Sequence, residues 1–321
     1  MSRFDPYEHA NVSLNPDGSL TRHMKLPTSP PTGEVPKIPG TAVLSKDVTL
    51  DAQKETWMRI YRPAKLPSND NAVVRLPIIL FLHGGGWIHM SVATTILHEM
   101  SNKISSDLPA IIVAVEFRLA PEHRLPAQYD DAIDALQWVR SQLTSSNGEQ
   151  WIRDYGDSSR CYLYGTSCGA NIAFNAAMRI QDLDLAPLTV VGIILNQPFI
   201  GGKARTRSEL KLATDQYFPL PMIDMLWELA LPPGTDRDHR FCNPFVDVQV
   251  KDKLKSVGRC LVVGFGGDPL IDRQQKLVQM MVEQGVMVEA RFDDVGFHCI
   301  DMIDTRRANA IVNFIKEFVC V

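Results

Sequence analysis

A serine hydroxyl framed by two glycines is the first group in this sequence whose spacing suggests chemistry. Gly165, Ser167 and Gly169 form a GxSxG motif that follows the apolar run 161–164 and precedes an Ala-rich segment with helical spacing. A strand, a tight turn and a helix in this order predict a nucleophile elbow, in which the turn pushes the hydroxyl clear of the backbone. The motif alone is moderately specific, because many α/β proteins have small-residue turns between a strand and a helix.

A serine is a weak nucleophile at neutral pH, so this motif needs a histidine as base and a carboxylate to orient that histidine. Two histidines follow Ser167 in the chain. His239 belongs to the charged run 236–240, which is typical of a solvated surface. His298 comes just after a predicted strand over 286–292, on a glycine-containing loop. Functional groups gather at the carboxyl ends of parallel strands, so His298 is the predicted base.

Asp268 is the predicted acid of this group. It lies between a predicted strand over 260–263 and Pro269, in a loop at the same edge of the sheet. Asp272 is the alternative carboxylate, but it falls one turn inside the next helix, where the helix dipole favours an acidic residue. Serine, aspartate and histidine then follow one another in the chain order of an α/β-hydrolase triad.

A glycine-rich loop can supply the fourth part of the site. Gly84, Gly85 and Gly86 follow an apolar run that predicts a buried strand. Their backbone N–H groups, with that of Cys168 after the serine, predict an oxyanion hole for a tetrahedral intermediate. A phosphate cradle is the alternative, but no Lys-Ser or Lys-Thr pair follows and no dinucleotide fingerprint is present. His83, before the glycines, is predicted to brace the loop.

The elements that must position these groups alternate between apolar strands and amphipathic helices. Strands are predicted over 75–82, 110–115, 161–164, 190–195, 260–263 and 286–292, after a hairpin over 48–62. Helices are predicted through the His98 region and over 129–143, the segment after the elbow, 270–283 and 305–318. This alternation predicts an α/β fold with a mostly parallel central sheet and helices on both faces.

Two segments interrupt this alternation. Residues 11–40 are rich in turn residues and prolines, and their scattered apolar side chains indicate an arm that lies over another part of the protein. A disordered tail is the alternative for this arm. Residues 199–244 are too long for an ordinary loop and contain a helix-like run over 221–231, which indicates a lid.

Composition narrows the class of partner. The chain has 321 residues, 45% of them hydrophobic, and its net charge of −4 provides no basic field for nucleic acid or an anionic membrane. The six cysteines show no metal-ligand or disulfide spacing, so no metal and no cofactor is expected. The stretch 1–6 has no apolar signal-peptide core behind it and no apolar run reaches membrane-spanning length, so a cytosolic protein is expected.

Seven motifs across the chain agree with one known family. They are HGGGW at 83–87, FRLAPEHRLP at 117–126, GTSCGAN at 165–171, WELALP at 227–232, DRDH at 236–239, GDPLID at 267–272 and GFH at 296–298. Together they resemble the plant carboxylesterases of the hormone-sensitive-lipase branch of the α/β-hydrolases, over nearly the whole chain from about Pro6. The resemblance implies Ser167 as nucleophile, Asp268 and His298 as its partners, and the 84–86 loop with Cys168 as the oxyanion hole.

The resemblance also implies how the rest of the chain is organised. One α/β-hydrolase domain over 1–321 would carry a cap, formed by about 1–45 and about 199–244, above the acyl and alcohol pockets. The expected state is a monomer or weak homodimer in the cytoplasm, with the nucleus as a second location. Bulky residues on the oxyanion loop or in the cap are candidate pocket walls, and they suggest short acyl chains and a hydrophobic alcohol: Trp87, Phe199, Ile200, Phe218, Met222, Ile223 and Trp227.

Three elbow positions depart from the family pattern. Thr166 stands where an acidic residue is usual, Cys168 where Ala or Ser is usual, and Ala170 where a second Gly is usual. Thr166 could alter hydrogen bonding behind the nucleophile. Cys168 is expected to be a packing residue, with a reactive thiol as the alternative. Because the oxyanion donor is a main-chain amide, catalysis should survive these changes.

The predicted function is hydrolysis of a small-molecule carboxylic ester through an acyl-enzyme, in plant specialised or hormone metabolism. A gibberellin- or strigolactone-type hormone-binding protein, or a slow hydrolase that acts as a receptor, is one alternative. A dehydratase or cyclase of specialised metabolism is another. The family's gibberellin receptors lack the triad histidine and its lyases alter a triad position, whereas this sequence retains all three.

Overall fold

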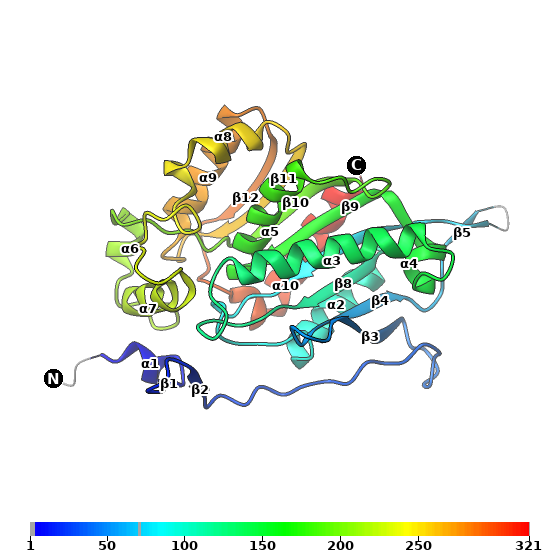
Figure 1. The fold of residues 1–321 in the computed structure, drawn as a ribbon, viewed down its shortest axis with the longest axis horizontal. Coiled ribbons are helices and arrows are strands. Elements are labelled where there is room, and N and C mark those ends of the chain that lie inside the picture. The colour runs from blue at the N-terminus through cyan, green and yellow to red at the C-terminus, as the bar shows by residue number, and fades with distance from the viewer. Residues whose placement is uncertain (1–3, 70–71, 321) are drawn as a thin grey trace.

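Eight strands form the central sheet of residues 4–69 and 72–320, the part of the chain that this computed structural model describes (Figure 1). Their order across the sheet is β12-β11-β10-β9-β7-β8-β4-β3. The pairs β3·β4 and β4·β8 are antiparallel and the other neighbours are parallel, which confirms the mostly parallel sheet. The strands are β3 (Val43–Asp51), β4 (Thr56–Pro63), β7 (Leu76–Leu82), β8 (Ile111–Glu116), β9 (Gly156–Thr166), β10 (Val190–Asn196), β11 (Arg259–Phe265) and β12 (Met287–Asp293).

Helices cover both faces of this sheet (Figure 1). On one face lie α2 (Thr95–Asp107) and α10 (Thr305–Val319). On the other lie α3 (Ala127–Thr144), α4 (Gln150–Tyr155), α5 (Cys168–Arg179) and α9 (Ile271–Glu283). The helices predicted after the elbow and over the other four segments are therefore present, with ends shifted by a few residues, whereas α4 was not predicted.

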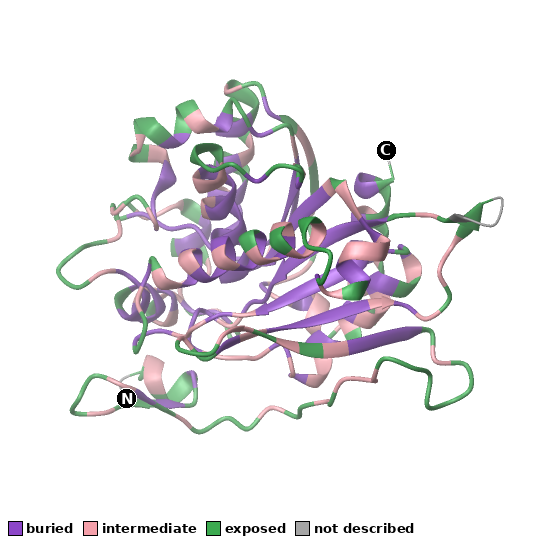
Figure 2. Ribbon diagram, turned by 45° about the vertical axis from the view of Figure 1, so that its right-hand side comes forward, coloured by how far each residue is buried: buried purple, intermediate pink, exposed green. Residues whose placement is uncertain are grey.

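Strand β7 explains why both faces need cover. All of its residues are buried. Ile78 and Leu80 pack into the hydrophobic cluster beneath α3 and α5, while Ile79 and Phe81 pack into the cluster beneath α2 and α10. Because successive side chains of a strand point to opposite faces, an apolar run without alternation requires an apolar layer on each side. Figure 2 shows this as continuous burial along the central strands.

The N-terminal arm lies on loops at the carboxyl edge of the sheet. It contains α1 (Pro6–His9) and the hairpin β1 (Val12–Leu14) and β2 (Leu20–Arg22). Arg22 forms an ion pair with Glu122 and donates to the carbonyl oxygens of Ile88 and Ala120. These partners belong to the loops that follow β7 and β8, so the arm is anchored there and is not a disordered tail.

The excursion between β10 and β11 is anchored to α9 and reaches the arm. It contains α6 (Arg207–Lys211) and α7 (Leu220–Ala230), which confirms the predicted helical run. Helix α8 (Val248–Leu254), which was not predicted, follows the predicted excursion over 199–244. Glu209 and Arg273 form a buried ion pair at 2.8 Å, and Ser208 donates to the carbonyl oxygen of Pro269 at 2.7 Å. Helix α7 contacts α1 of the arm. The short elements β5 (Ser68–Asn69), β6 (Ala72–Val73), η1 (Ile180–Asp182), η2 (Pro244–Val246) and η3 (Ile300–Met302) complete the described chain.

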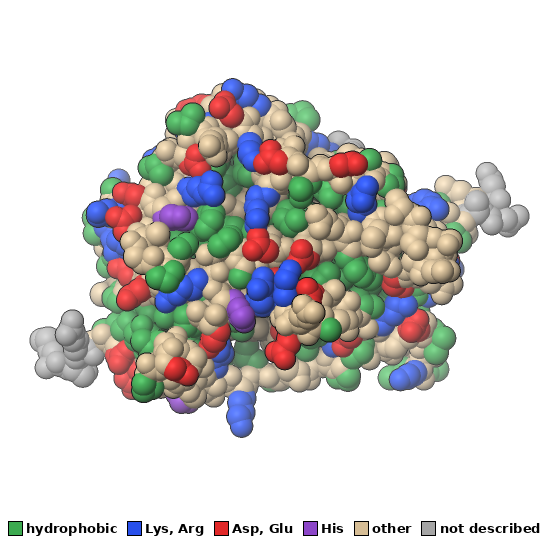
Figure 3. Space-filling model, viewed as in Figure 1, with side chains coloured by type: hydrophobic (Ala, Val, Ile, Leu, Met, Phe, Trp, Pro, Cys, Tyr) green, Lys and Arg blue, Asp and Glu red, His purple; other side chains and the backbone are tan. Residues whose placement is uncertain are grey.

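The surface carries charges of both signs. Lys and Arg side chains are interspersed with Asp and Glu on the face shown in Figure 3, and do not gather in one patch. Within the described ranges, no helix combines the length and apolarity needed to cross a membrane. Of the N-terminal stretch considered for a signal peptide, residues 1–3 lie outside the described part of the chain.

Candidate active site

Ser167 occupies the turn between β9 and α5, with backbone angles φ 53° and ψ −118°. A non-glycine residue with positive φ is strained, and such strain clusters at functional sites. A Cβ on Gly165 would lie 2.1 Å from the carbonyl oxygen of Gly169, and a Cβ on Gly169 would lie 2.0 Å from that of Leu82. Only glycine therefore allows β9, α5 and β7 to approach this closely. The Ser167 amide also donates to the carbonyl oxygen of Asn196 at 2.8 Å, which holds the turn against β10.

Three side chains from three loops form a hydrogen-bonded chain. Ser167 Oγ lies 2.8 Å from His298 Nε2, and His298 Nδ1 lies 2.8 Å from Asp268 Oδ2. All three residues are buried. Asp268 also accepts the backbone amide of Leu270 and the side-chain amide of Gln274, each at 2.8 Å, and these bonds orient the carboxylate. The fold thus brings together the predicted nucleophile, base and acid, which are far apart in sequence.

The electrostatics of this chain suit proton transfer. Burial alone would lower the pKa of His298, but the negative charge of Asp268, the neighbouring Cys299 and the hydrogen bond to Asp268 raise that pKa well above its ordinary value of 6.5. A carboxylate on Nδ1 stabilises the imidazolium that forms when Nε2 takes a proton. The arrangement can therefore activate the Ser167 hydroxyl by general base catalysis.

The glycine-rich loop runs directly past the nucleophile. A Cβ on Gly84 would lie 3.5 Å from the Cβ of Ser167. Gly85 and Gly86 have φ of +108° and +61°, a conformation that glycine adopts without strain. Cys168 begins α5 on the other side of the serine. Backbone from both segments therefore lies close to Ser167, and the amides of these segments stay the predicted donors of an oxyanion hole.

The atypical elbow residues are packed into this loop. Cys168 Sγ accepts the Trp87 amide at 3.2 Å and donates to the His83 carbonyl oxygen at 3.7 Å. Burial raises the pKa of Cys168 to about 12, so its thiol stays protonated and packs instead of reacting. Thr166 is also buried, and its hydroxyl lies 3.3 Å from the position of a Cβ on Gly84. Cys168 therefore bonds to the backbone of the residues on either side of the three glycines, and Thr166 lies beside Gly84.

Aromatic side chains gather beside the triad. The rings of Trp87, Phe199 and Trp227 have centroids 4.6–5.0 Å apart, and all three side chains are fully buried. Phe218 stacks on the imidazole of His298, with centroids 4.3 Å apart and ring planes 10° apart. The excursion thus places an aromatic ring directly on the base.

The remaining predicted wall residues belong to the same hydrophobic cluster. Ile200 and Ile223 are buried in it, and Met222 packs at its edge. Sequence reasoning missed Tyr217, which stacks on Phe297 with centroids 4.5 Å apart. Two consecutive aromatic residues of the excursion therefore stack on two consecutive residues of the histidine loop. The pair of adjacent aromatics in the sequence was the signal that could have drawn attention to this segment.

Two alternatives raised by the sequence lie outside the triad. His239 is half-buried on the excursion, and its Nδ1 accepts the amide of Phe241 at 3.3 Å. Asp272 accepts the amide of Ser208 at 2.8 Å, which ties α9 to α6. Both residues hold parts of the excursion in place, and neither contacts the serine or the base in the described chain.

His83 is enclosed behind the glycine loop. Its Nδ1 lies 2.7 Å from the carbonyl oxygen of Gly84, and its ring stacks on Phe117 with centroids 4.2 Å apart. Burial lowers the pKa of His83 to about 4. The enclosed ring and its contact with the Gly84 carbonyl oxygen support the prediction that His83 braces the loop.

A polar network behind the histidine loop was also missed. The partly buried carboxylate of Asp301 accepts the side-chain amides of Asn196 at 3.0 Å and Gln197 at 2.9 Å. Gln197 Oε1 in turn accepts the backbone amide of Cys299 at 2.7 Å. The network therefore holds the residue next to His298 against the end of β10. The only signal in the sequence was the position of Asp301 three residues after the base.

Comparison with known proteins finds related sequences and a matching family. The family profile described as alpha/beta hydrolase fold matches residues 79–302. The chain is 52% identical to probable carboxylesterase 9 of Arabidopsis thaliana, over 98% of this chain and 97% of that protein. It is 41% identical to the 3-O-acetylpapaveroxine carboxylesterase CXE2 of Papaver somniferum, over 98% of this chain and 99% of that protein.

Two further similarities are to a hormone receptor and to a solved esterase structure. The gibberellin receptor GID1C of Arabidopsis thaliana is 32% identical, over 90% of this chain and 85% of the receptor. Among solved structures, the hyperthermophilic esterase of the archaeon Pyrobaculum calidifontis superposes with a TM-score of 0.71 at 23% identity, over 86% of this chain and 84% of the esterase. At that identity the superposition concerns the fold alone.

Proposed function

The chain belongs to the plant carboxylesterases of the α/β-hydrolase family, a class of serine carboxylic ester hydrolases, and we propose that it cleaves a small-molecule ester through Ser167, His298 and Asp268. The observation that carries this proposal is the unbroken chain of two 2.8 Å hydrogen bonds from the Ser167 hydroxyl to the Asp268 carboxylate. Among the described residues, no group of three or more His, Cys, Asp or Glu side chains is placed to hold a metal ion.

The reaction proceeds through an acyl-enzyme. His298 Nε2 takes the proton of the Ser167 hydroxyl as its oxygen attacks the ester carbonyl carbon. Backbone amides of the glycine loop and of Cys168 stabilise the oxyanion of the tetrahedral intermediate. His298 then gives its proton to the departing alcohol. In the second half of the reaction, His298 takes a proton from water as the water attacks the acyl-enzyme, and returns that proton to Ser167 Oγ as the acid is released. Asp268 holds the imidazole in one tautomer throughout.

The neighbouring aromatic cluster supports a substrate with a hydrophobic alcohol part and a short acyl chain. The relative from Papaver somniferum is named for an acetyl compound, 3-O-acetylpapaveroxine, and this supports a role in specialised metabolism, with hormone metabolism as the alternative. In this proposal the arm and the excursion form the cap over the substrate, and the protein acts in the cytoplasm, and also in the nucleus, as a monomer or weak homodimer.

Turnover of p-nitrophenyl acetate by the Ser167→Ala variant tests the assignment. We expect loss of activity by roughly 10⁴-fold or more, because the nucleophile is removed while binding remains. The matched control is Cys168→Ala, which changes the adjacent side chain but keeps the backbone donor and should retain most activity. Covalent labelling of the wild-type protein by an organophosphate should map to Ser167. Undiminished turnover by Ser167→Ala would refute the proposal.

A hormone receptor is the second candidate, favoured by the similarity to the gibberellin receptor. His298 within hydrogen-bond distance of Ser167 supports catalysis instead, because a receptor that only binds needs no base. Equilibrium binding of gibberellins to the Ser167→Ala variant, together with inert p-nitrophenyl esters in the wild type, would favour the receptor. A dehydratase or cyclase would be revealed by product formation without loss of an acyl group.

A further inference from the structure

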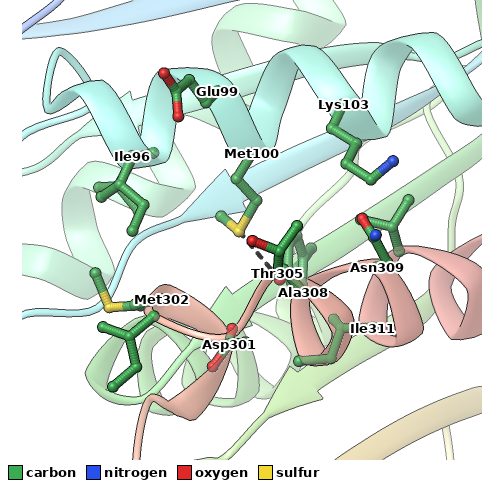
Figure 4. Close-up of a pocket in the computed structure, with 14 residues that line it drawn as sticks. Ile96, Glu99, Met100, Lys103, Asp301, Met302, Thr305, Ala308, Asn309 and Ile311 are labelled. Atoms are coloured by element: carbon green, nitrogen blue, oxygen red, sulfur yellow. Dashed lines mark hydrogen bonds between the residues drawn. The ribbon is translucent and has the colours of Figure 1, made fainter.

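A cavity of about 230 Å³ lies between α2 and the start of α10, on the face of the sheet opposite to α5 (Figure 4). Most of its wall is apolar: Ile96 and Met100 come from α2, Met302 from η3, and Ala308 and Ile311 from α10. The close-up shows the Met100 side chain pointing into the space between the two helices. Nothing in the proposed mechanism uses this cavity.

Two oxygen groups line the inner end of the cavity: the buried hydroxyl of Tyr164 and the partly buried carboxylate of Asp301. The Tyr164 hydroxyl donates to the thioether sulfur of Met100 across 3.9 Å, and sulfur is a weak acceptor. Asp301 presents a carboxylate that has accepted one amide on each oxygen and retains further lone pairs. Burial and then the charge of Asp301 raise the pKa of Tyr164 well above its ordinary value, while a hydrogen bond with the Asn196 side chain lowers it. A buried donor with a poor acceptor beside a carboxylate is an incomplete polar site.

The inner end of the cavity is joined to the histidine loop. Helix η3, which contributes Asp301 and Met302, begins two residues after His298. The Asp301 carboxylate holds Gln197, and Gln197 holds the backbone amide of Cys299. A molecule that hydrogen-bonds to Asp301 therefore perturbs the carboxylate that, through Gln197, positions the residue beside the base.

The dimensions and polarity of the cavity select a chemical class. An apolar cavity of about 150 Å³ accommodates benzene, so this larger cavity has room for one aromatic ring with a small substituent. The thioether groups of Met100 and Met302 favour contact with an aromatic ring. A neutral hydroxyl matches both polar groups, because it can accept from Tyr164 and donate to Asp301, whereas an ammonium group could only donate.

We propose that this cavity is a regulatory site for a single-ring phenol, separate from the ester site, and that its occupancy lowers kcat through Asp301, Gln197 and the His298 loop. The binding part of the proposal is independent of the catalytic assignment. The kinetic part rests on the proposed esterase function. The phenol binds without covalent change, with its ring between α2 and α10 and its hydroxyl at the inner end.

Calorimetric titration of the full-length protein with 4-ethylphenol, and with ethylbenzene as the analogue without the hydroxyl, tests the site. We expect saturable binding of 4-ethylphenol and weaker binding of ethylbenzene. Ala308→Phe fills the cavity from α10 and should weaken 4-ethylphenol binding at least tenfold. Tyr164→Phe removes only the hydroxyl. It should weaken the binding of 4-ethylphenol about three- to tenfold and leave the affinity for ethylbenzene unchanged. Wild-type affinity in a folded Ala308→Phe variant, or no binding to the wild type, would overturn the proposal.

Kinetics separate this site from the ester site. With p-nitrophenyl acetate as substrate, 4-ethylphenol should lower kcat without raising KM, by roughly fivefold at saturation, and should lose this effect in Ala308→Phe. A rise in KM alone would place the phenol in the ester site and overturn the regulatory assignment. If Ala308→Phe does not fold, Tyr164→Phe still decides through its selective loss of phenol affinity. Absence of all turnover in the wild type would refute the esterase proposal, while the calorimetry would still test the cavity.

Discussion

Two buried histidines in different regions of this protein show how neighbours set the role of one side chain. His298, at the carboxyl edge of the sheet, faces the carboxylate of Asp268, and its pKa is raised well above 6.5. His98, on α2, faces the hydroxyl of Tyr61 at 3.1 Å and the guanidinium of Arg59 at 3.4 Å. Burial and the positive charge of Arg59 lower the pKa of His98 to about 4. One histidine can accept a proton during turnover, and the other stays neutral.

The two regions also differ in what they hold together. Arg59 forms two hydrogen bonds with the carboxylate of Asp47 and donates to the carbonyl oxygen of Ser29 at 2.7 Å. The His98 region therefore fastens the N-terminal arm to the sheet through β3 and β4. The His298 region instead connects three loops through hydrogen bonds that can exchange a proton. Depth of burial alone does not separate a reactive histidine from a structural one; the sign of the nearest charge does.

The largest expected effect is that of removing the charge beside His298. Asp268→Asn should lower kcat for p-nitrophenyl acetate by about 10⁴-fold. The imidazolium would lose its counter-charge, and the neutral imidazole would no longer be held in the tautomer that leaves Nε2 free to accept a proton. Residual activity should also titrate at a lower pH, since the negative charge no longer raises the pKa of His298. Steady-state kinetics from pH 5 to 9 measure both quantities.

Asp272→Asn is the matched control for this prediction. It removes a carboxylate four residues away that accepts the amide of Ser208 and does not contact His298. We expect this variant to keep activity within a few-fold of the wild type. Equal losses in both variants would mean that the carboxylates act through the stability of α9, and would contradict the assigned role of Asp268.

A smaller effect is expected for the stability provided by the His98 region. The folded-state pKa of His98 lies below its unfolded value, so its contribution is complete above pH 6.5 and is lost as the pH falls toward 4. His98→Gln keeps an acceptor for Tyr61 and Arg59 but cannot titrate. Between pH 7 and pH 4.5, the free energy of unfolding should therefore fall by about 1–2 kcal/mol less in the variant than in the wild type. This difference is smaller than the full pKa shift of His98 would give, because solvent screens part of the region.

Urea denaturation of both proteins at the two pH values measures this difference. Burial raises the pKa of Glu116, in the same region, to about 7, so Glu116 contributes with the opposite sign in both proteins. The comparison between wild type and variant therefore isolates His98. Parallel stability curves for the two proteins would show that His98 is not held neutral by its surroundings.

The smallest effect is expected where an aromatic ring covers the reactive histidine. An aromatic face stabilises a cation by about 0.5–1 kcal/mol, so we expect the stacked ring of Phe218 to favour the protonated form of His298. Phe218→Leu should shift the rising limb of kcat/KM about half a unit toward lower pH, because the neutral imidazole is the active base. Tyr217→Leu, one residue earlier, is the control and should leave the limb in place. A change in KM with an unshifted limb would limit Phe218 to substrate contact.

Much of the fold and the composition of the candidate triad could be predicted from the order of the residues. The apolar run of β7 indicated a strand buried on both faces, and its alternate residues do enter two different clusters. The choice of Asp268 over Asp272 followed from position, because a loop residue after a parallel strand faces the shared edge while a residue inside the helix is carried away from it. Short elements such as α4 and α8 were missed because they carry too few turns for a periodic pattern.

The sequence by itself determined the features that depend on local spacing: the glycines that permit the elbow, the order of the strands along the chain, and the loops that carry the serine, aspartate and histidine. Only the tertiary structure decided which distant side chains meet. Segments far apart in the chain meet in the stacking of Phe218 on His298 and in the bonds from Asp301 through Gln197 to Cys299. The opposite pKa shifts of the two histidines also arise from residues distant in the sequence. The physical reason is that charge, hydrogen bonding and desolvation act over a few ångströms of space, and local spacing does not record those distances.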